Sequence, residues 1–267
     1  MDSYPLYFDA FNEKGLGMGG LQFDGYAKYS HDIESDKLNL AEFEFVPYIL
    51  GTCETVDEAY DVIKDLNLTD TPFSGNLPVS PLHWMISDKE RSIVVESTEK
   101  GLDIYDNPVD VLTNDPTFDI QLFNLNNYLK VSNKNPTNTF TKDYPLKDYS
   151  RGMGGIGLPG DYSSMSRFVK EVFVSQNSVV DDDSEVSSVN QFFHLLSAAA
   201  QPNGSTLVHE NPNKYEHTIY TSCMNLKEGV FYYRTYDNLN INHVDFDSYD
   251  LDGKELSFVE LKKGSFD

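Results

Sequence analysis

The chain has 267 residues, enough to bury a full core, and its 39% hydrophobic and 13% aromatic content is typical of a globular protein. Twenty basic residues stand against 43 acidic ones, and the net charge of −23 repels phosphate backbones and anionic lipid surfaces. We therefore expect no nucleic acid and no membrane among the partners, and an anionic substrate would need a local positive group.

The absence of recognisable targeting signals and the small number of cysteines favour a cytoplasmic location. No apolar run of about 18 residues is present, so no membrane span is predicted. The N-terminus lacks the basic-then-apolar pattern of a signal peptide. The two cysteines, Cys53 and Cys223, give no disulfide framework, which fits a reducing compartment.

Four helices are predicted in chain order. Thr55 followed by Glu58 forms a capping box, and apolar residues at helical spacing predict a helix over 55–66. The next two are expected at 118–129 and 163–175. A solvated loop over 178–188, with three consecutive aspartates, precedes the last helix, at 187–200, which stops before Gln201-Pro202.

Strands are predicted in two clusters separated by short polar turns. The first comprises Leu82–Ser87, Ser92–Glu96, Leu102–Tyr105 and Val109–Leu112. The second comprises Thr218–Met224, Val230–Tyr236, Ile241–Phe246 and Glu255–Leu261. Runs of strands between runs of helices indicate an α+β fold, and two antiparallel sheets covered by helices would satisfy the pattern. With no repeat and no long linker, residues 1–267 are expected to form a single domain.

Several motifs occur in one order along almost the whole chain. They are Tyr4-Pro5 followed by Asn12–Gly17, Pro81–Asp88, Val111–Pro116, Gly155–Asp161 followed by Ser166-Arg167-Phe168, Thr218–Cys223 and Phe231–Tyr233. In this order they resemble the choloylglycine hydrolases, the family of bile salt hydrolases and penicillin V acylases. The resemblance implies an N-terminal-nucleophile hydrolase with an αββα sandwich and no cofactor or metal.

The resemblance also implies how the family cleaves a linear amide. Its members use an N-terminal cysteine, whose free α-amine titrates near neutrality and can take the thiol proton. In the family this cysteine and a nearby arginine and aspartate precede the Tyr-Pro motif, which here is Tyr4-Pro5. We therefore expect the chain to lack its nucleophile and first strands and to be inactive as written. Cys53 and Cys223 are interpreted as ordinary buried thiols, and His83 as structural.

Three positions match the catalytic motifs of the family. Asn114 matches its oxyanion asparagine, although a turn-capping role before Pro116 is the alternative. Arg167 matches an arginine expected beside the cysteine sulfur, the alternative being a surface arginine. Gln22 stands where bile salt hydrolases usually have asparagine and penicillin V acylases tyrosine; it keeps the amide on a longer side chain.

An apolar substrate pocket is expected by resemblance. The residues proposed to line it are Phe8, Phe73, Leu77 and Leu82, and core packing is the alternative for them. The expected substrate is a small molecule, a conjugated bile acid cleaved to release glycine or taurine, and a homotetramer is suggested by family. Alternatives are a penicillin V acylase-like amidase, a non-catalytic remnant or binding protein, and a gene model begun at an internal methionine.

Overall fold

The structure is a computed structural model that describes residues 4–208 and 211–264. Its largest element is a five-stranded antiparallel sheet in the order β1-β2-β5-β6-β7. The strands are β1 (Asp9–Phe11), β2 (Gly17–Gln22), β5 (Leu82–Ser87), β6 (Ser92–Thr98) and β7 (Gly101–Asp106). Strand β6 is almost wholly buried because both faces of the sheet are covered.

One face of this sheet packs against α1 (Glu42–Thr52) and α2 (Val56–Ile63). Trp84 and Ile86 of β5 point to these helices because alternate residues of a strand share a face. The intervening residue Met85 and Val94 of β6 point the other way, Val94 toward a second core with Phe118 and Phe168. A short parallel pair, β3 (Leu38–Ala41) with β4 (Leu66–Thr69), flanks α1 and α2.

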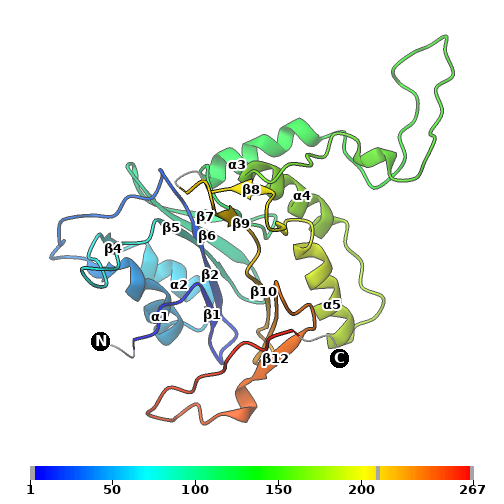
Figure 1. Cartoon of the computed structure of the whole chain (residues 1–267). Helices are drawn as coiled ribbons and strands as arrows, with labels where there is room; N and C mark the ends of the chain where they lie inside the picture. The colour runs from blue at the N-terminus through cyan, green and yellow to red at the C-terminus, as the bar shows by residue number, and fades with distance from the viewer. Residues whose placement is uncertain (1–3, 209–210, 265–267) are drawn as a thin grey trace.

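The second sheet has the order β10-β11-β12 and is also antiparallel. Its strands are β10 (Tyr220–Asn225), β11 (Val230–Thr235) and β12 (Asn242–Asp245). Helix α5 (Glu185–Leu196) packs on β10 through Val189 and Phe193, which contact Cys223. Figure 1 shows the resulting order: α1 and α2, the large sheet, then the small sheet with α4 (Ser164–Gln176) and α5 on the far side.

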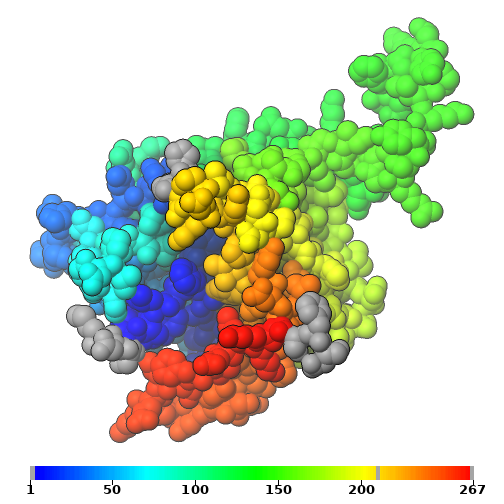
Figure 2. Space-filling model, viewed as in Figure 1, coloured from blue at the N-terminus to red at the C-terminus, as the bar shows by residue number. Residues whose placement is uncertain are grey.

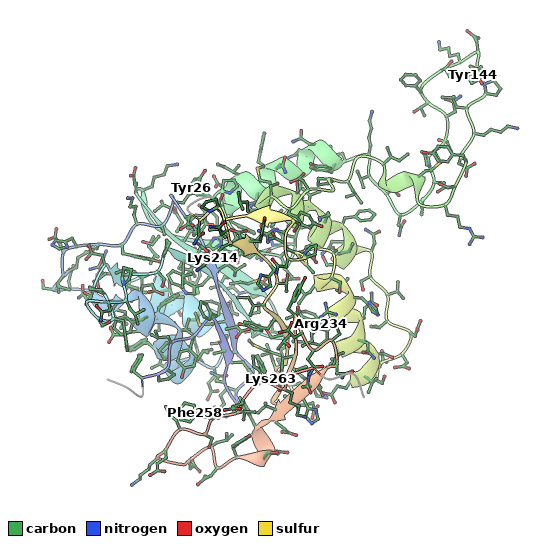
Figure 3. All side chains as sticks on the ribbon, viewed as in Figure 1. Tyr26, Tyr144, Lys214, Arg234, Phe258 and Lys263 are labelled. Atoms are coloured by element: carbon green, nitrogen blue, oxygen red, sulfur yellow. The ribbon has the colours of Figure 1, made fainter. Side chains whose placement is uncertain are left out.

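The remaining elements connect these layers. Helix α3 (Phe118–Asn124) follows β7 and continues as the 3₁₀ helix η1 (Leu125–Tyr128), while η2 is Met153–Gly155 and η3 is Phe246–Ser248. A short hairpin of β8 (Thr206–Leu207) and β9 (Tyr215–Glu216) leads into β10. Between η1 and η2 the chain projects from the body as an arm of residues 133–150, with Tyr144 near its tip (Figures 1 and 3).

The strand predictions are confirmed except for two. Val109–Leu112 is a loop, because Asp110 has a φ of 54° and the Asn107 side chain binds the backbone at Val109 and Val111. Residues 255–261 are extended and exposed with no neighbouring strand; the chain attaches afterwards, where Lys262 N donates to the Tyr233 hydroxyl.

Helix ends also differ from the prediction. The helix predicted over 55–66 ends at Ile63, because Leu66–Thr69 pairs with β3 instead. The helix predicted over 118–129 tightens into η1 after Asn124. The helix predicted over 187–200 lies at 185–196. It begins earlier because the Ser184 side chain accepts a hydrogen bond from Ser187 N, and at its end Ser197 Oγ donates to Phe193 O.

Candidate active site

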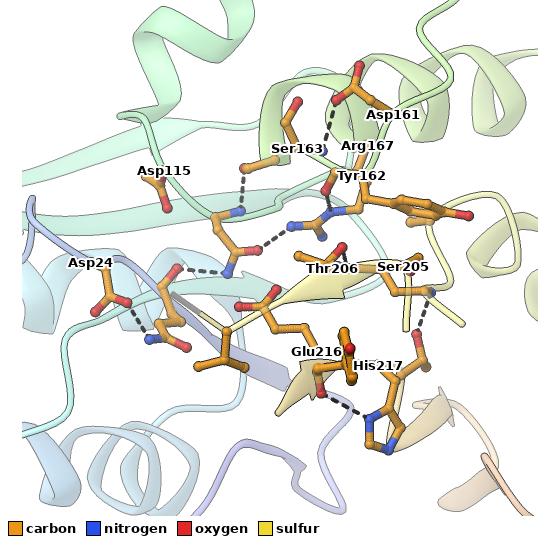
Figure 4. A pocket seen from close by; sticks show the side chains of 18 of the residues that line it. Asp24, Asp115, Asp161, Tyr162, Ser163, Arg167, Ser205, Thr206, Glu216 and His217 are labelled. Atoms are coloured by element: carbon orange, nitrogen blue, oxygen red, sulfur yellow. Dashed lines mark hydrogen bonds between the residues drawn. The ribbon is translucent and has the colours of Figure 1, made fainter. Parts of the chain in front are cut away.

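The described residues form a cavity of about 1000 Å³ between several elements. Its wall combines the end of β2, the loop after β7, the first turn of α4 and the segment around β8 and β9. Figure 4 shows Arg167 and Tyr162 on one side, facing Glu216 and Asp24 across the opening. In Figure 2 this region lies where the yellow segment overhangs the blue N-terminal part of the chain. Elements far apart in sequence therefore form one site.

Asn114 sits on the loop that joins β7 to α3. Its Nδ2 donates to Gln22 O at 2.8 Å, and its Oδ1 accepts from Arg167 Nη2 at 2.6 Å. The amide orientation follows from chemistry: a guanidinium only donates and a carbonyl only accepts. Its second N–H hydrogen has no partner among the described groups, so it is free to donate to a substrate oxygen.

Arg167 lies in the first turn of α4, whose N-cap Ser163 accepts from Ser166 N. Its Nε donates to Tyr162 O at 3.0 Å, so two bonds fix the plane of the half-buried guanidinium. Burial lowers the pKa of Arg167, whereas the carboxylates of Glu216 and Asp115 raise it. Since free arginine titrates above 12, the side chain stays a cation in the cavity.

Gln22 ends β2, and its backbone carbonyl rather than its side chain contacts Asn114. The exposed side chain turns to the solvent and its Nε2 donates to an Asp24 carboxylate oxygen. The structure thus brings together Gln22, Asn114 and Arg167, the three residues predicted as catalytic.

The four predicted pocket residues do not line this cavity. Phe8 is 69% exposed and Leu77 is 47% exposed. Phe73 packs edge-on against Phe43 at a ring separation of 5.1 Å. Leu82 is buried in the core beneath α1 and α2, as its core-packing alternative predicted. Their substrate role stays a prediction.

Sequence reasoning missed the residues that hold the Asn114 loop. Ser164 Oγ accepts from Asn114 N at 2.9 Å and lies 2.9 Å from Thr113 Oγ1. Gln121 Nε2 reaches Asn114 O at 3.3 Å and Asp115 O at 3.2 Å. Neither residue belongs to a periodic or charged pattern, and their role depends on α3 and α4 packing side by side, so no local signal in the sequence identifies them.

Both cysteines lie outside the cavity and are buried, as predicted. Cys53 follows α1, and burial raises the pKa of its thiol. Cys223 lies in β10 against α5, where burial raises its pKa to about 11. Neither is poised as a thiolate. Residues 4–208 and 211–264 hold no cluster of three His, Cys, Asp or Glu able to bind a metal, and none of their helices could cross a membrane.

These contacts suit stabilisation of an oxyanion. A carboxamide N–H held by two fixed partners can donate to an oxygen that gains charge during the reaction, without moving. Arg167 fixes that amide and adds the positive charge that an anionic substrate needs inside an acidic protein. The cavity itself contributes Asp24, Asp115, Asp161 and Glu216 around this cation.

Comparison with known proteins identifies the family. The profile of the linear amide C–N hydrolases, choloylglycine hydrolase family, matches residues 1–259. A bile salt hydrolase/transferase of Lactiplantibacillus plantarum is 53% identical over 98% of this chain and 80% of its own.

Comparison with solved structures supports the same family. A variant of conjugated bile acid hydrolase from Clostridium perfringens superposes with a TM-score of 0.91 and 39% identity, over 98% of this chain and 80% of that one. Penicillin V acylase from Agrobacterium tumefaciens shares the fold, with a TM-score of 0.70 at 22% identity over 92% of this chain and 68% of that one. The layered sandwich is thus the N-terminal-nucleophile hydrolase fold, and the chain belongs to the choloylglycine hydrolase family of linear amide C–N hydrolases.

Proposed function

We propose that the cavity around Asn114 binds the amide of a conjugated bile acid and forms the oxyanion-stabilising part of an amide hydrolase site. Relatives of 53% and 39% identity bear the names bile salt hydrolase/transferase. A volume of about 1000 Å³ is at the upper end of ordinary ligand pockets, which suits a steroid with its conjugated amino acid. The products would be the free bile acid and glycine or taurine.

The contact that carries this proposal is Arg167 Nη2 to Asn114 Oδ1 at 2.6 Å. It turns the Asn114 N–H toward the cavity, where an attacked amide carbonyl would become an oxyanion. The Gln22 side chain is exposed, so its Nε2 would leave Asp24 and donate to the substrate as a second amide donor. The acidic end of the conjugate is an anion, and Arg167 is the one lysine or arginine among the described residues lining the cavity.

The described part of this cavity does not supply the cysteine nucleophile that the family uses. Of the described residues that line it, none is a cysteine, and the two cysteines of the sequence are buried in separate cores. We therefore propose that these 267 residues by themselves bind the conjugate without turning it over. The same reasoning applies to penicillin V, the substrate of the alternative acylase activity.

Three further expectations belong to the same proposal. Phe8 and Leu77 offer exposed apolar surface for the steroid, and Phe73 and Leu82 are proposed to line the same apolar pocket. A homotetramer is supported by the arm at 133–150, whose exposed Phe140, Tyr144 and Tyr149 offer contact surface. A cytoplasmic location is supported by the two free thiols.

Binding tests the proposal. We expect glycocholate to bind the purified chain. Arg167→Gln should weaken the affinity about 10- to 100-fold, which corresponds to the free energy of one hydrogen bond to a charged group. Asn114→Ala should have a smaller effect, because its contact strengthens only as the oxyanion forms. Asn126→Ala, an exposed asparagine on η1, is the matched control. Isothermal titration calorimetry measures all four; equal affinities across them, or none in the wild type, would reject the site.

Turnover is measured separately as glycine released from glycocholate. We expect none from the wild-type chain. Release that persists in a Cys53→Ser, Cys223→Ser double variant would show that a different group attacks the amide, and the proposed division between binding and nucleophile would be wrong.

A further inference from the structure

The loop that carries Asn114 lies over a buried pair of ionisable side chains. His83 of β5 and Glu96 of β6 are both 0% exposed, and Nδ1 of His83 lies 3.0 Å from Oε1 of Glu96. Ionisable side chains are rarely buried so completely unless they are paired. Neither side chain lines the cavity, so their contacts must explain them.

The pair holds both ends of the Asn114 loop. His83 Nε2 lies 2.8 Å from Thr113 O, immediately before Asn114. Glu96 accepts from Phe118 N with both oxygens, at 3.0 and 3.2 Å, where the loop enters α3. Residues 113 and 118 are thereby tied to two adjacent central strands, and the span between them can move little.

The hydrogen-bonding partners place the protons. Thr113 O can only accept, so Nε2 of His83 carries a hydrogen. One more proton lies between Nδ1 and Oε1. Both Glu96 oxygens already accept the Phe118 N–H, which favours the ionised carboxylate and leaves that proton on His83. Phe23 stacks on the imidazole at 4.3 Å with the planes 5° apart, and an aromatic face is a favourable neighbour for a cation.

We propose that His83 and Glu96 form an imidazolium–carboxylate pair that positions Asn114, acting through Thr113 and Phe118 rather than on the substrate. The inference rests on the proposed function of Asn114. His83 holds the loop by donating Nε2–H to Thr113 O, and the hydrogen bond between its Nδ1 and Glu96 fixes the orientation of the imidazole. Arg167 then sets the direction of an amide whose backbone is already fixed.

The test uses Glu96→Gln, which retains the size of the side chain and an oxygen for Phe118 N but removes the charge. In ¹⁵N NMR of the wild type at neutral pH, both His83 ring nitrogens should resonate as protonated. In Glu96→Gln, Nδ1 should move to the unprotonated position, and the Asn114 side-chain amide signals should shift or broaden. His83→Gln should affect the Asn114 signals in the same way. Ser97→Ala is the control, because Ser97 neighbours Glu96 in β6 but bonds Lys28 O on the other side of the sheet.

The outcomes of these experiments distinguish a failure of this inference from a failure of the proposed function. A neutral His83 in the wild type would overturn it, and that measurement needs no variant to fold. Asn114 signals that are unchanged in both Glu96→Gln and His83→Gln would overturn it as well. Glycocholate added to the wild type tests the function independently. If it leaves the Asn114 signals in place, the proposed substrate fails, while the positioning effect, measured without ligand, still stands.

Discussion

Ser164 contacts three polar groups, two on the loop that carries Asn114 and one on α3. Its hydroxyl accepts from Asn114 N, contacts Thr113 Oγ1 and lies 3.2 Å from Gln121 Nε2. Because Ser164 begins α4, this one side chain joins the loop that carries Asn114 to the helix that carries Arg167. The distance between the two catalytic candidates therefore depends on a serine.

Ser164→Ala should destabilise the fold by about 1–3 kcal/mol, the cost of leaving buried polar partners unsatisfied. Urea unfolding at 25 °C measures the change. Ser175→Ala is the control on the same helix, since its hydroxyl bonds only Val172 O within one turn. Equal losses in the two variants would mean that the Ser164 contacts contribute nothing beyond those of an ordinary helix serine.

Glu171 lies one turn beyond Arg167 and lines a separate pocket with the apolar residues Met85, Leu195 and Leu196. Only 6% of the residue is exposed, and its Oε1 has no hydrogen-bond partner among the described atoms. Burial raises the pKa of Glu171 to about 7, although Ala199, Lys170 and Arg167 oppose the shift. An ionised carboxylate is thus poorly accommodated here.

The contribution of Glu171 to the stability of the protein should fall as pH rises above the range of an ordinary carboxyl. The folded state binds the Glu171 proton more tightly than the unfolded state, whose carboxyl titrates near 4.5. The protonated form is therefore favoured in the fold, and stability declines between about pH 4.5 and 7. Glu171→Gln should remove up to about 3 kcal/mol of that decline, at about 1.4 kcal/mol per pKa unit.

Urea unfolding at pH 5 and pH 8 measures this difference. Glu99→Gln, an exposed glutamate on the turn after β6, controls for the loss of one negative charge. Parallel pH dependences in wild type and Glu171→Gln would show that Glu171 reaches solvent and titrates normally.

At the scale of elements, the sequence predicts what local patterns encode. Thr55 caps α2 through Glu58 N as the capping box indicated, and β5 has the predicted bounds. Helix α1 escaped prediction because its apolar residues surround most of the helix and Pro47 lies inside it. The strand wrongly predicted at 255–261 shows the converse: an apolar, β-prone segment forms no strand where no partner strand lies beside it.

For the candidate site, too, the sequence identified some residues and not others. Motif resemblance identified Asn114 and Arg167, which the fold brings to 2.6 Å. It did not identify Ser164, Gln121 or the His83–Glu96 pair, whose roles exist only once separate elements pack together. Phe8 and Leu82 show the limit for the pocket, because one is exposed and the other is in the core, which hydrophobicity alone does not distinguish.

The arm at 133–150 is attached to the body by a close backbone contact at η2. A side chain added at Gly154 would collide with the carbonyl groups of Ser132 and Lys134, whereas at Gly155 it would meet Leu158 at an ordinary 3.5 Å. In addition, Ser132 N donates to Gly154 O at 2.9 Å. The base of the arm therefore requires glycine at position 154.

Gly154→Ala should displace the base of the arm and make it more accessible. We expect faster cleavage within 133–150 by trypsin, which has Lys134, Lys142 and Lys147 as sites there. Gly155→Ala is the matched control and should be cleaved at the wild-type rate. Identical cleavage rates in both variants would indicate that the backbone at 132–134 yields without cost.

For the whole molecule, charge is the dominant departure from an ordinary globular protein. The net charge of −23 arises from 43 acidic against 20 basic residues. The ion pairs of the described residues are mostly exposed, such as Lys14 with Glu54 and Lys89 with Glu90, and exposed pairs contribute little. Mutual repulsion between carboxylates therefore opposes the compact state with little local compensation.

Added salt should stabilise this fold. Raising NaCl from about 0.05 to about 0.5 M shortens the screening length from more than 10 Å to a few Å, which weakens repulsion between surface carboxylates while leaving buried contacts intact. We expect the melting temperature at pH 7.5 to rise, measured by circular dichroism. The control is the same titration near pH 4.4, the isoelectric point, where no net repulsion remains to be screened and the rise should vanish. A melting temperature that falls with NaCl at pH 7.5, or that rises equally at both pH values, would show that net charge does not limit stability, and that specific ion pairs or the general effect of salt on apolar surface decide the response instead.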